Sequence, residues 1–346
     1  MPLRRLRSVT PAVTALATVV ALGLGVVGGK AVFADNADDA SGGGDAPVAG
    51  TRVDVIVKAT NSEFWQSMLA GSKRAGHDLG LRLGLFGPTA ETDIEPQIQL
   101  VEDSISRGAQ AIVLAANSST ALNGVIDKAR KAGVRVITVD NAVTTETEGF
   151  LGTDNIKAGQ QAGQRMCRLM TARGHEDGAV LHETSVSGVQ VLGDRFDGFK
   201  KGLAEKCPHA RVTQTLANNN DVNAAVGQVS DALTKSSRPA GIFADNNVSG
   251  IGTAKAVQEK KAQDSVPVVS FDSDPAEIAA VKTGAIDAIV VQNPYFFGYQ
   301  GVVEAVMAKA GSPAPANLDP GAVLVDGKNV ADRDLASLLN PPKVKK

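Results

Sequence analysis

Residues 133–143 read GVRVITVDNAV, and this stretch decides how the chain is expected to fold. Val134, Val136, Ile137 and Val139 form a near-continuous apolar run, which predicts a strand that is buried on both faces of a sheet. The strand runs directly into Asp140, a carboxylate. Residues 266–275, VPVVSFDSDP, repeat the pattern, because an apolar strand again ends on an aspartate, Asp272. Two buried strands that end on carboxylates at matching places indicate a site.

Short apolar runs alternate with amphipathic stretches from Thr51 onward. Repeated alternation of strand and helix requires parallel sheets covered by helices on both faces. The runs are too numerous for one sheet, so the predicted fold class is α/β with two doubly wound parallel-sheet lobes. Residues 111–143 and 241–275 share one order of strand, Asn-containing turn, helix, strand and Asp. Ligands of such sheets bind beyond the carboxyl ends of the strands, where this order places Asn117, Asp140, Asn246 and Asp272.

The N-terminal part of the chain has the pattern of an export signal. Three arginines within residues 1–7 precede an uncharged apolar run at 11–29, and AVFA at 31–34 follows with small residues suited to a cleavage site. Residues 1–34 are therefore predicted to be a cleaved signal or a retained membrane anchor. Residues 35–50, rich in Gly, Ser, Asp and Ala, are predicted to be a flexible linker. In either case the rest of the chain is expected in the periplasm or at the outer face of the cytoplasmic membrane.

Charge and cysteine content narrow the functional classes. Four of the 35 Lys and Arg lie in residues 1–34, which leaves 31 basic groups against 37 acidic ones and argues against a nucleic-acid partner. The hydrophobic fraction of 43% is that of a soluble globular protein. Cys167 and Cys207 are the chain's two cysteines. They either form a disulfide or remain buried free thiols, and two cysteines alone cannot make a structural zinc site.

Two motifs suggest an enzyme, but the residues around them do not fit that interpretation. GLGVVG at 23–28 matches a dinucleotide fingerprint, but it lies in the leader with no strand before it. His182 and Glu183 in VLHETSVSG lack both the second His of a metalloprotease helix and the serine elbow of a hydrolase. A strand end followed by a polar loop explains the second motif better. The sequence therefore predicts no catalysis, no metal and no cofactor.

Phe64 and Trp65 are adjacent aromatic residues in a chain that is only 4% aromatic, and Trp65 is its single tryptophan. One interpretation makes both of them core residues at the start of a helix. The alternative places them at a cleft, where aromatic faces stack on the apolar face of a sugar ring. Carboxylate, guanidinium and amide side chains bind vicinal hydroxyls, so polar residues near the strand ends complete this second interpretation: Asp140, Arg195, Asn246, Asp272 and Gln292.

These residues together resemble the ribose-binding-like family of solute-binding proteins, the type I periplasmic sugar receptors of ABC transporters and chemotaxis. The resemblance covers residues 53–325 and is carried by several motifs in order: KATNSEFWQSMLAGSKRAGHDLG, RVITVD, LGTDNIKAGQQAG, GDRFDGFKKGL, GIFADNNVSGIGTAKAV, VVSFDSDP and VVQNPYFFGYQGV. It implies that Phe64 and Trp65 stack on the sugar, that Asp140 accepts two hydroxyls, and that Arg195 reaches the ring from the other lobe. Asn246, Asp272 and Gln292 would complete the polar ring.

The resemblance also implies a division into lobes. The N-terminal lobe would comprise residues 51–153 and 293–320, the C-terminal lobe 154–292 and 321–335, and the tail 336–346. A three-segment hinge would lie near residues 152–155, 292–294 and 320–324.

The sequence departs from ribose binders at several positions of the motifs. Ser62, with Asn61 beside it, replaces the Asn before the aromatic pair, and Asn141 replaces the Arg after the first Asp. Ala115 ends the third strand, and Asn220 stands where a second aromatic would enclose the ring. A different pentose, a hexose or a cyclic polyol is therefore expected as the ligand.

Two functions agree with this resemblance. The first is a monomeric, non-enzymatic receptor that delivers a neutral monosaccharide to an ABC permease in the membrane. The second is a sugar sensor that presents its ligand to a receptor kinase or chemoreceptor, which a retained N-terminal anchor would favour. Repressors with this fold carry a DNA-binding helix-turn-helix where this chain has an export leader, so a repressor is not expected.

Overall fold

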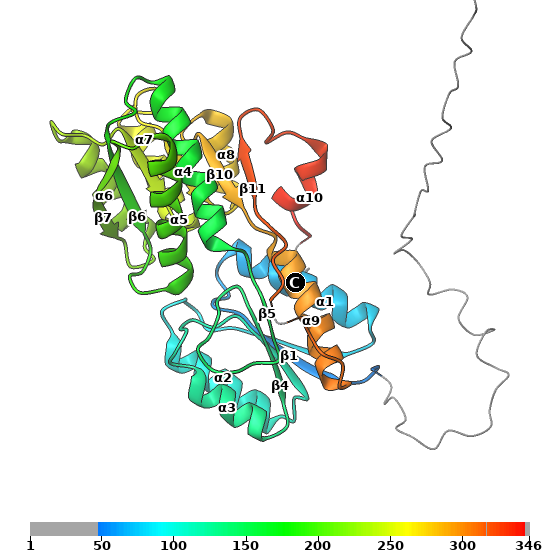
Figure 1. Cartoon of the computed structure of the whole chain (residues 1–346). Helices are drawn as coiled ribbons and strands as arrows, with labels where there is room; N and C mark the ends of the chain where they lie inside the picture. Colours follow the sequence, from blue (N-terminus) through cyan, green and yellow to red (C-terminus); the bar gives the residue numbers. More distant parts are fainter. Residues whose placement is uncertain (1–47, 316, 343–346) are drawn as a thin grey trace, which may run out of the picture. The chain divides into compact units, whose positions relative to one another are not determined.

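Two β-sheets organise residues 48–315 and 317–342, the part of the chain described by the structure, a computed structural model (Figure 1). The predicted leader at 1–34 lies outside the described residues, as do most of the predicted linker and the end of the tail. No helix within the described ranges combines the length and the apolar character needed to cross a bilayer.

The first sheet has the strand order β2-β1-β3-β4-β5, and all its pairings are parallel. Helices cover both of its faces (Figure 1). Its strands are β1 (Arg52–Ile56), β2 (Arg82–Phe86), β3 (Ala111–Leu114), β4 (Arg135–Val139) and β5 (Gly149–Leu151). Its helices are α1 (Glu63–Asp78) and α9 (Pro294–Lys309) on one face, and α2 (Ile94–Ser106) and α3 (Asn123–Lys131) on the other.

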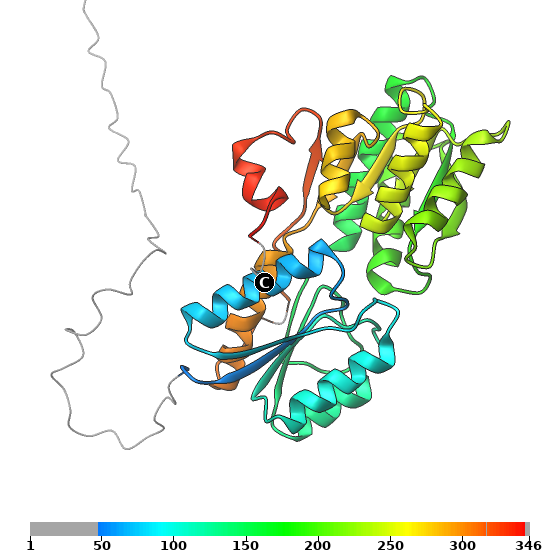
Figure 2. The same ribbon diagram turned by 180° about the vertical axis from the view of Figure 1, so that it is seen from behind.

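The second sheet has the order β11-β10-β9-β8-β6-β7, in which only β11 runs antiparallel to its neighbour (Figure 2). Its strands are β6 (Ala179–Thr184), β7 (Arg211–Ala217), β8 (Gly241–Ala244), β9 (Val268–Phe271), β10 (Ala288–Val291) and β11 (Val323–Asp326). Its helices are α4 (Asn155–Ala172) and α5 (Gln190–Lys206) on one face, and α6 (Val222–Thr234), α7 (Asn247–Glu259) and α8 (Pro275–Thr283) on the other. The predicted α/β class with two doubly wound lobes is confirmed.

The apolar strands are buried on both sides because successive side chains alternate between two cores. In β1, Val53 and Val55 pack with residues of α1 and α9, whereas Ile56 packs with residues of α2 and α3. In β8, Ile242 packs toward α6 to α8 and Phe243 toward α4 and α5. This double burial explains the continuous apolar runs in the sequence.

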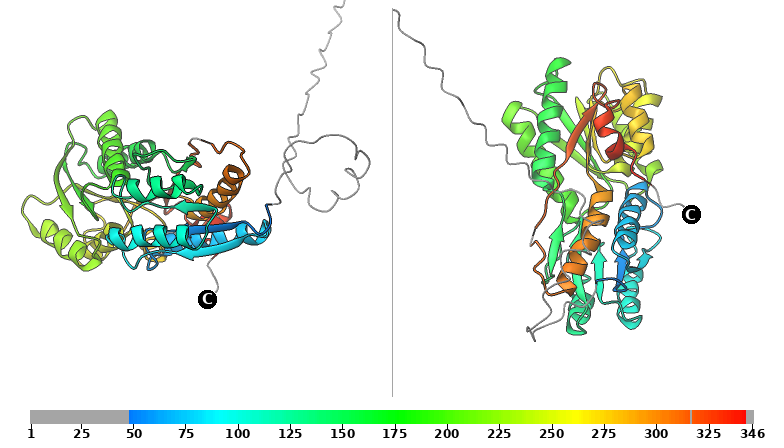
Figure 3. Two further views of the ribbon diagram at one scale, coloured as in Figure 1. Left: turned by 90° about the horizontal axis from the view of Figure 1, so that it is seen from below. Right: turned by 90° about the vertical axis from the view of Figure 1, so that its right-hand side faces the viewer.

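The chain passes between the sheets at three places. It leaves the first sheet after β5, returns after β10 to form α9, and crosses again before β11. The right-hand view of Figure 3 shows α9 (orange) beside the first sheet and β11 (red) beside the second. The crossings fall in the segments predicted as a hinge. The hinge motion and the exact lobe boundaries stay predictions.

Beyond β11 the chain forms the short helices η1 (Arg333–Leu335) and α10 (Ala336–Leu339). Leu339 is buried in the core of the second sheet. The first part of the predicted tail is therefore packed against this lobe.

The two aspartates that end β4 and β9 adopt the same unusual backbone conformation. Asp140 has φ 64° and Asp272 has φ 79°, both in the left-handed region. The Asp140 N–H donates to the Leu151 carbonyl of β5, and the Asp272 N–H donates to the Val290 carbonyl of β10. Aspartate is among the few residues other than glycine that visit this region routinely. The repeated sequence pattern is therefore a repeated structural device that turns the chain sharply at the carboxyl end of each strand.

The helices α4 and α5 pack backbone to backbone because glycines line their contact. A Cβ added to Gly159 would clash with the Arg195 carbonyl, and one added to Gly198 would clash with the Ile156 carbonyl. The Sγ atoms of Cys167 in α4 and Cys207 at the end of α5 are joined in the structure, with a Cα–Cα distance of 5.7 Å. This pair of helices also carries Arg195 to the end of the sheet.

The cysteine pair gives a direct test. Thiol titration of the denatured, unreduced protein is expected to find no free thiol, because both cysteines would be consumed in the Cys167–Cys207 bond. The same protein after reduction serves as the positive control and should give two thiols. Two thiols before reduction would favour the alternative of buried free cysteines.

Candidate functional site

A cavity of about 290 Å³ lies at the carboxyl ends of the strands, lined by loops that follow strands of both sheets. From the first sheet come residues after β1, β2, β3 and β4, and from the second come residues after β6, β8, β9 and β10. This is the place where doubly wound sheets bind ligands. Its walls include these residues predicted from the sequence: Ser62, Phe64, Trp65, Asp140, Asn141, Arg195, Asn246, Asp272 and Gln292.

Two of the predicted residues are not among the cavity walls. Asn61 is exposed, one residue before the extended Ser62 from which α1 starts. Asn220 lies in the turn after β7, where its N–H donates to the Ser185 carbonyl. Strand β7 is the edge strand of its sheet, and the loop after β6 lines the cavity in its place. A contact of Asn61 or Asn220 with the ligand therefore stays a prediction.

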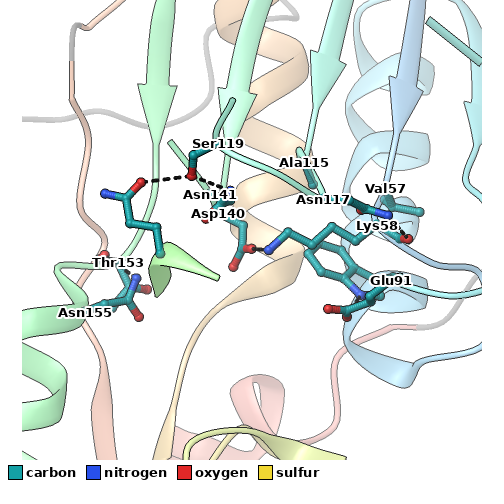
Figure 4. Close-up of polar contacts among 12 residues, drawn as sticks. Val57, Lys58, Glu91, Ala115, Asn117, Ser119, Asp140, Asn141, Thr153 and Asn155 are labelled. Carbon is teal, nitrogen blue, oxygen red and sulfur yellow. Dashed lines mark hydrogen bonds and ion pairs between the residues drawn. The ribbon is translucent and has the colours of Figure 1, made fainter. Parts of the chain in front are cut away.

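A buried ion pair joins the ends of β1 and β4. Lys58 Nζ lies 2.6 Å from Asp140 Oδ2, and both side chains are about 95% buried (Figure 4). The ammonium also lies 5.5 Å from the centre of the Trp65 ring. An ammonium has three N–H donors, so Lys58 can hold Asp140 and still donate to a ligand. Sequence analysis missed Lys58, which lies two residues beyond the end of β1, whereas Asp140 directly follows β4.

Three amide and carboxylate oxygens at the cavity are buried and have no hydrogen-bond partner. They are Asn117 Oδ1 after β3, Asn141 Oδ1 after β4 and Asp272 Oδ1 after β9. An unsatisfied buried polar group costs about 1–3 kcal/mol. A ligand that brings hydroxyl donors to these oxygens recovers that cost, so the site is suited to a molecule with several hydroxyl groups.

Arg195 is 4% exposed and holds three acceptors from three different elements. Its Nε donates to Asn155 Oδ1, and its two terminal nitrogens donate to the Asp245 carbonyl and to Gln292 Oε1. The guanidinium lies 4.3 Å from the Phe271 ring centre, and Gln292 in turn donates to Thr153. A guanidinium has five N–H donors, so the remaining ones are free to meet a ligand in the cavity that Arg195 lines.

The aromatic pair lies in both of the places considered from the sequence, the core at the start of a helix and the wall of a cleft, while stacking on a sugar stays a prediction. Trp65 is 3% exposed and belongs to the core of the first sheet, yet it also lines the cavity beside Phe64. The two rings meet edge to face with centres 4.8 Å apart. The indole N–H donates to Glu91 Oε1 at 2.6 Å. Glu91, which sequence analysis also missed, therefore fixes the orientation of the tryptophan.

Burial raises the pKa of Asp272 to about 6, and the nearby Arg195 offsets part of this effect. The carboxylates of Asp140 and Glu91, which belong to the first lobe, make smaller contributions to this raised pKa. Asp272 Oδ2 accepts a hydrogen bond from the Asn247 N–H. The cavity thus places acidic groups of both lobes within electrostatic range.

Among residues 48–315 and 317–342, no group of three or more His, Cys, Asp or Glu could hold a metal ion.

Residues 53–313 match the family described as "Periplasmic binding protein domain". The chain belongs to this family. The resemblance to ribose-binding-like type I receptors that the sequence motifs indicate is thereby confirmed.

Relatives and solved structures agree with this membership. The D-allose-binding periplasmic protein of Escherichia coli K12 is 26% identical over 282 residues, which cover 79% of this chain and 89% of the relative. A ribose import binding protein of Haemophilus influenzae is 24% identical and covers 76% of this chain and 87% of its own. A carbohydrate transporter solute-binding protein from Agrobacterium radiobacter, solved with D-arabinose, is 33% identical with a TM-score of 0.81, covering 84% of this chain and 99% of its own. An ABC transporter solute-binding protein from Agrobacterium vitis, solved with D-fucose, is 27% identical with a TM-score of 0.77. The match covers 84% of this chain and 100% of the other.

Proposed function

We propose that the protein is an extracytoplasmic receptor that binds a neutral monosaccharide and delivers it to an ABC permease. The observation that carries this proposal is the set of three buried, unpartnered oxygens on Asn117, Asn141 and Asp272 in one cavity. Sugar hydroxyls can donate to these oxygens and accept from Lys58 and Arg195. Phe64 and Trp65 supply an apolar wall for the ring.

The charges favour a neutral ligand. Lys58 is already paired with Asp140, Arg195 interacts electrostatically with Asp272, and Glu91 adds a further negative charge, so the cavity has no excess of positive charge. A sugar acid or sugar phosphate would place its anion near these carboxylates, which repel it. The named relatives support the same class, since their ligands are allose, ribose, D-arabinose and D-fucose.

A panel of pentoses, hexoses and cyclic polyols tests the function. We expect at least one neutral member to raise the unfolding free energy by about 2.7 kcal/mol at 100 times its dissociation constant, because only the folded protein binds it. Thermal unfolding gives the screen, and calorimetry then gives the stoichiometry. The sugar acid that corresponds to the best ligand is the matched control and should bind far more weakly. Absence of binding by every neutral member would remove the proposal.

Trp65 provides an optical test of the aromatic wall. Its emission should be blue without ligand, because the ring is 3% exposed, and should change on binding, because the same ring lines the cavity. Trp65 is the single tryptophan, so the Trp65→Phe variant should lose the signal altogether. Saturable binding by calorimetry with unchanged emission would refute stacking on Trp65 and leave the receptor function intact.

A further inference from the structure

A second cavity of about 90 Å³ adjoins the first. Both cavities are lined by Phe64, Asn247 and Asp272, which form the boundary between them. The remaining walls come from α1, from the start of α8 and α9, and from the segment after α10. The second cavity is thus bordered by both lobes and by the C-terminal segment, immediately beside the place proposed for the sugar ring.

Two buried polar atoms without partners belong to residues that line this second cavity. Ser67 is 3% exposed and its Oγ has no hydrogen-bond partner. Asp272 is 7% exposed; its Oδ2 accepts from the Asn247 N–H at 3.1 Å, but its Oδ1 has no partner. A hydroxyl oxygen can both donate and accept, whereas a carboxylate oxygen only accepts. One ligand hydroxyl could therefore satisfy both groups, by donating to Asp272 and exchanging a hydrogen bond with Ser67.

The size of the cavity limits what can enter it. One water molecule occupies about 30 Å³ of the liquid, so a cavity of about 90 Å³ holds a group of a few non-hydrogen atoms. A second sugar ring is too large. Phe64, Pro275, Leu339 and Pro341 supply apolar wall, which suits a carbon atom attached to the hydroxyl.

We propose that this second cavity is a subsite for the exocyclic hydroxymethyl group of a hexose whose ring occupies the first cavity. This inference rests on the proposed function and sharpens it, because it makes the ligand a hexose and not the pentose with the same ring. Ser67 and Asp272 determine this preference, while the other polar groups of the first cavity bind the ring.

Matched sugars separate the subsite from the ring site. L-arabinose, D-fucose and D-galactose share one ring configuration and carry hydrogen, methyl and hydroxymethyl at C5; D-xylose, 6-deoxy-D-glucose and D-glucose form a second set, and D-ribose, 6-deoxy-D-allose and D-allose a third. In the set that the protein binds, calorimetry should show the hexose binding at least tenfold more tightly than the pentose. The 6-deoxy sugar should lose most of this gain, because it lacks the hydroxyl.

Two substitutions in opposite walls of the second cavity test whether the hydroxymethyl group binds there. Ser67→Val, which removes the hydroxyl and fills space, should weaken hexose binding at least tenfold and change pentose binding less than twofold. Ser273→Leu fills the cavity from the other lobe and is expected to act in the same selective way, which keeps the test open if Ser67→Val does not fold. Lys200→Ala on the exposed side of α5 is the control and should change neither affinity.

The outcomes distinguish this inference from the proposed function. Selective loss of the hexose supports the subsite. A pentose that binds as tightly as its hexose, or variants that weaken both sugars alike, would overturn the subsite and leave the receptor function standing. If the wild-type protein binds no sugar of any set, the proposed function fails and the subsite with it.

Discussion

Replacing Arg195 with alanine is expected to weaken sugar binding by at least about 2 kcal/mol, which corresponds to roughly thirtyfold in the dissociation constant. The side chain lines the cavity and is buried, so its loss removes donors to the ligand. It also leaves Asn155 Oδ1, the Asp245 carbonyl and Gln292 Oε1 without their Arg195 donor. Calorimetry with the tightest-binding sugar of the panel measures the effect.

The unfolding free energy of the ligand-free protein should fall as well, since each buried acceptor left without a donor costs about 1–3 kcal/mol. Arg195→Lys separates charge from geometry. A lysine keeps the positive charge, but one ammonium cannot reproduce the planar fork that spans three elements, so we expect intermediate affinity. Lys200→Ala, five residues further along α5 and exposed, should leave affinity unchanged. An Arg195→Ala protein that still binds within twofold of the wild type would refute the role given to this residue.

The position of Arg195 could be predicted from a motif, but its connections could not. The sequence places it in a helix before a Gly-Phe pair, and the resemblance directs it to the ligand. The contacts with Asn155 and Gln292 come from residues 40 and 97 positions away, beside two of the three crossings between the sheets. Such pairings arise from packing of the whole chain and leave no local pattern.

The contact between Lys58 and Asp140 is another long-range pairing that the sequence does not reveal. An aspartate after an apolar strand is conspicuous because it ends a run of buried residues at a predicted sheet edge. A lysine in the same place is usually a solvated surface residue, so nothing local indicates that Lys58 is buried. Only the parallel alignment of β1, β3 and β4 brings it to Asp140, which is 82 positions away.

Two edge strands of the sheets are too short to leave a long apolar run in the sequence. β5 has three residues, Gly149–Leu151, and pairs only with β4 at the edge of its sheet. β11, four residues long, is an antiparallel edge strand inside a segment assigned to the hinge and the second lobe. Central parallel strands carry long apolar runs because both of their faces are buried, whereas edge strands need no such run. Strand periodicity therefore predicts the centre of each sheet better than its edges.

Buried carboxyl groups make the stability of this protein depend on pH. Glu183 in β6 is fully buried, and its Oε1 accepts from Asn218 while its Oε2 has no partner. Burial, with a smaller contribution from the nearby Asp245, raises the pKa of Glu183 to about 8 although the hydrogen bond from Asn218 acts in the opposite direction. Burial likewise raises the pKa of Glu304 to about 7 and that of Glu277 well above its ordinary value.

The direction in which pH changes the unfolding free energy follows from the number of protons bound by the folded and unfolded chains. Between about pH 4.5 and pH 8 the folded protein keeps a proton on Glu183 that the unfolded chain has released, so rising pH favours the unfolded chain. The loss approaches about 1.4 kcal/mol per pH unit for one such group. We expect the unfolding free energy without sugar to be lower at pH 8 than at pH 6 by about 2 kcal/mol from Glu183 alone. Urea denaturation at a series of pH values measures this slope.

Glu183→Gln assigns the slope to one residue. Glutamine keeps the shape and an oxygen acceptor for Asn218 but binds no proton in this range, so its unfolding free energy should fall less steeply between pH 6 and pH 8. It should also exceed that of the wild type at pH 8, where the wild type bears the cost of a buried, partly ionised carboxylate. Glu259→Gln, an exposed position in α7, is the matched control and should keep the wild-type slope. A Glu183→Gln slope equal to that of the wild type would show that Glu183 is already ionised in the folded protein at pH 6, and that its buried environment does not favour the neutral acid.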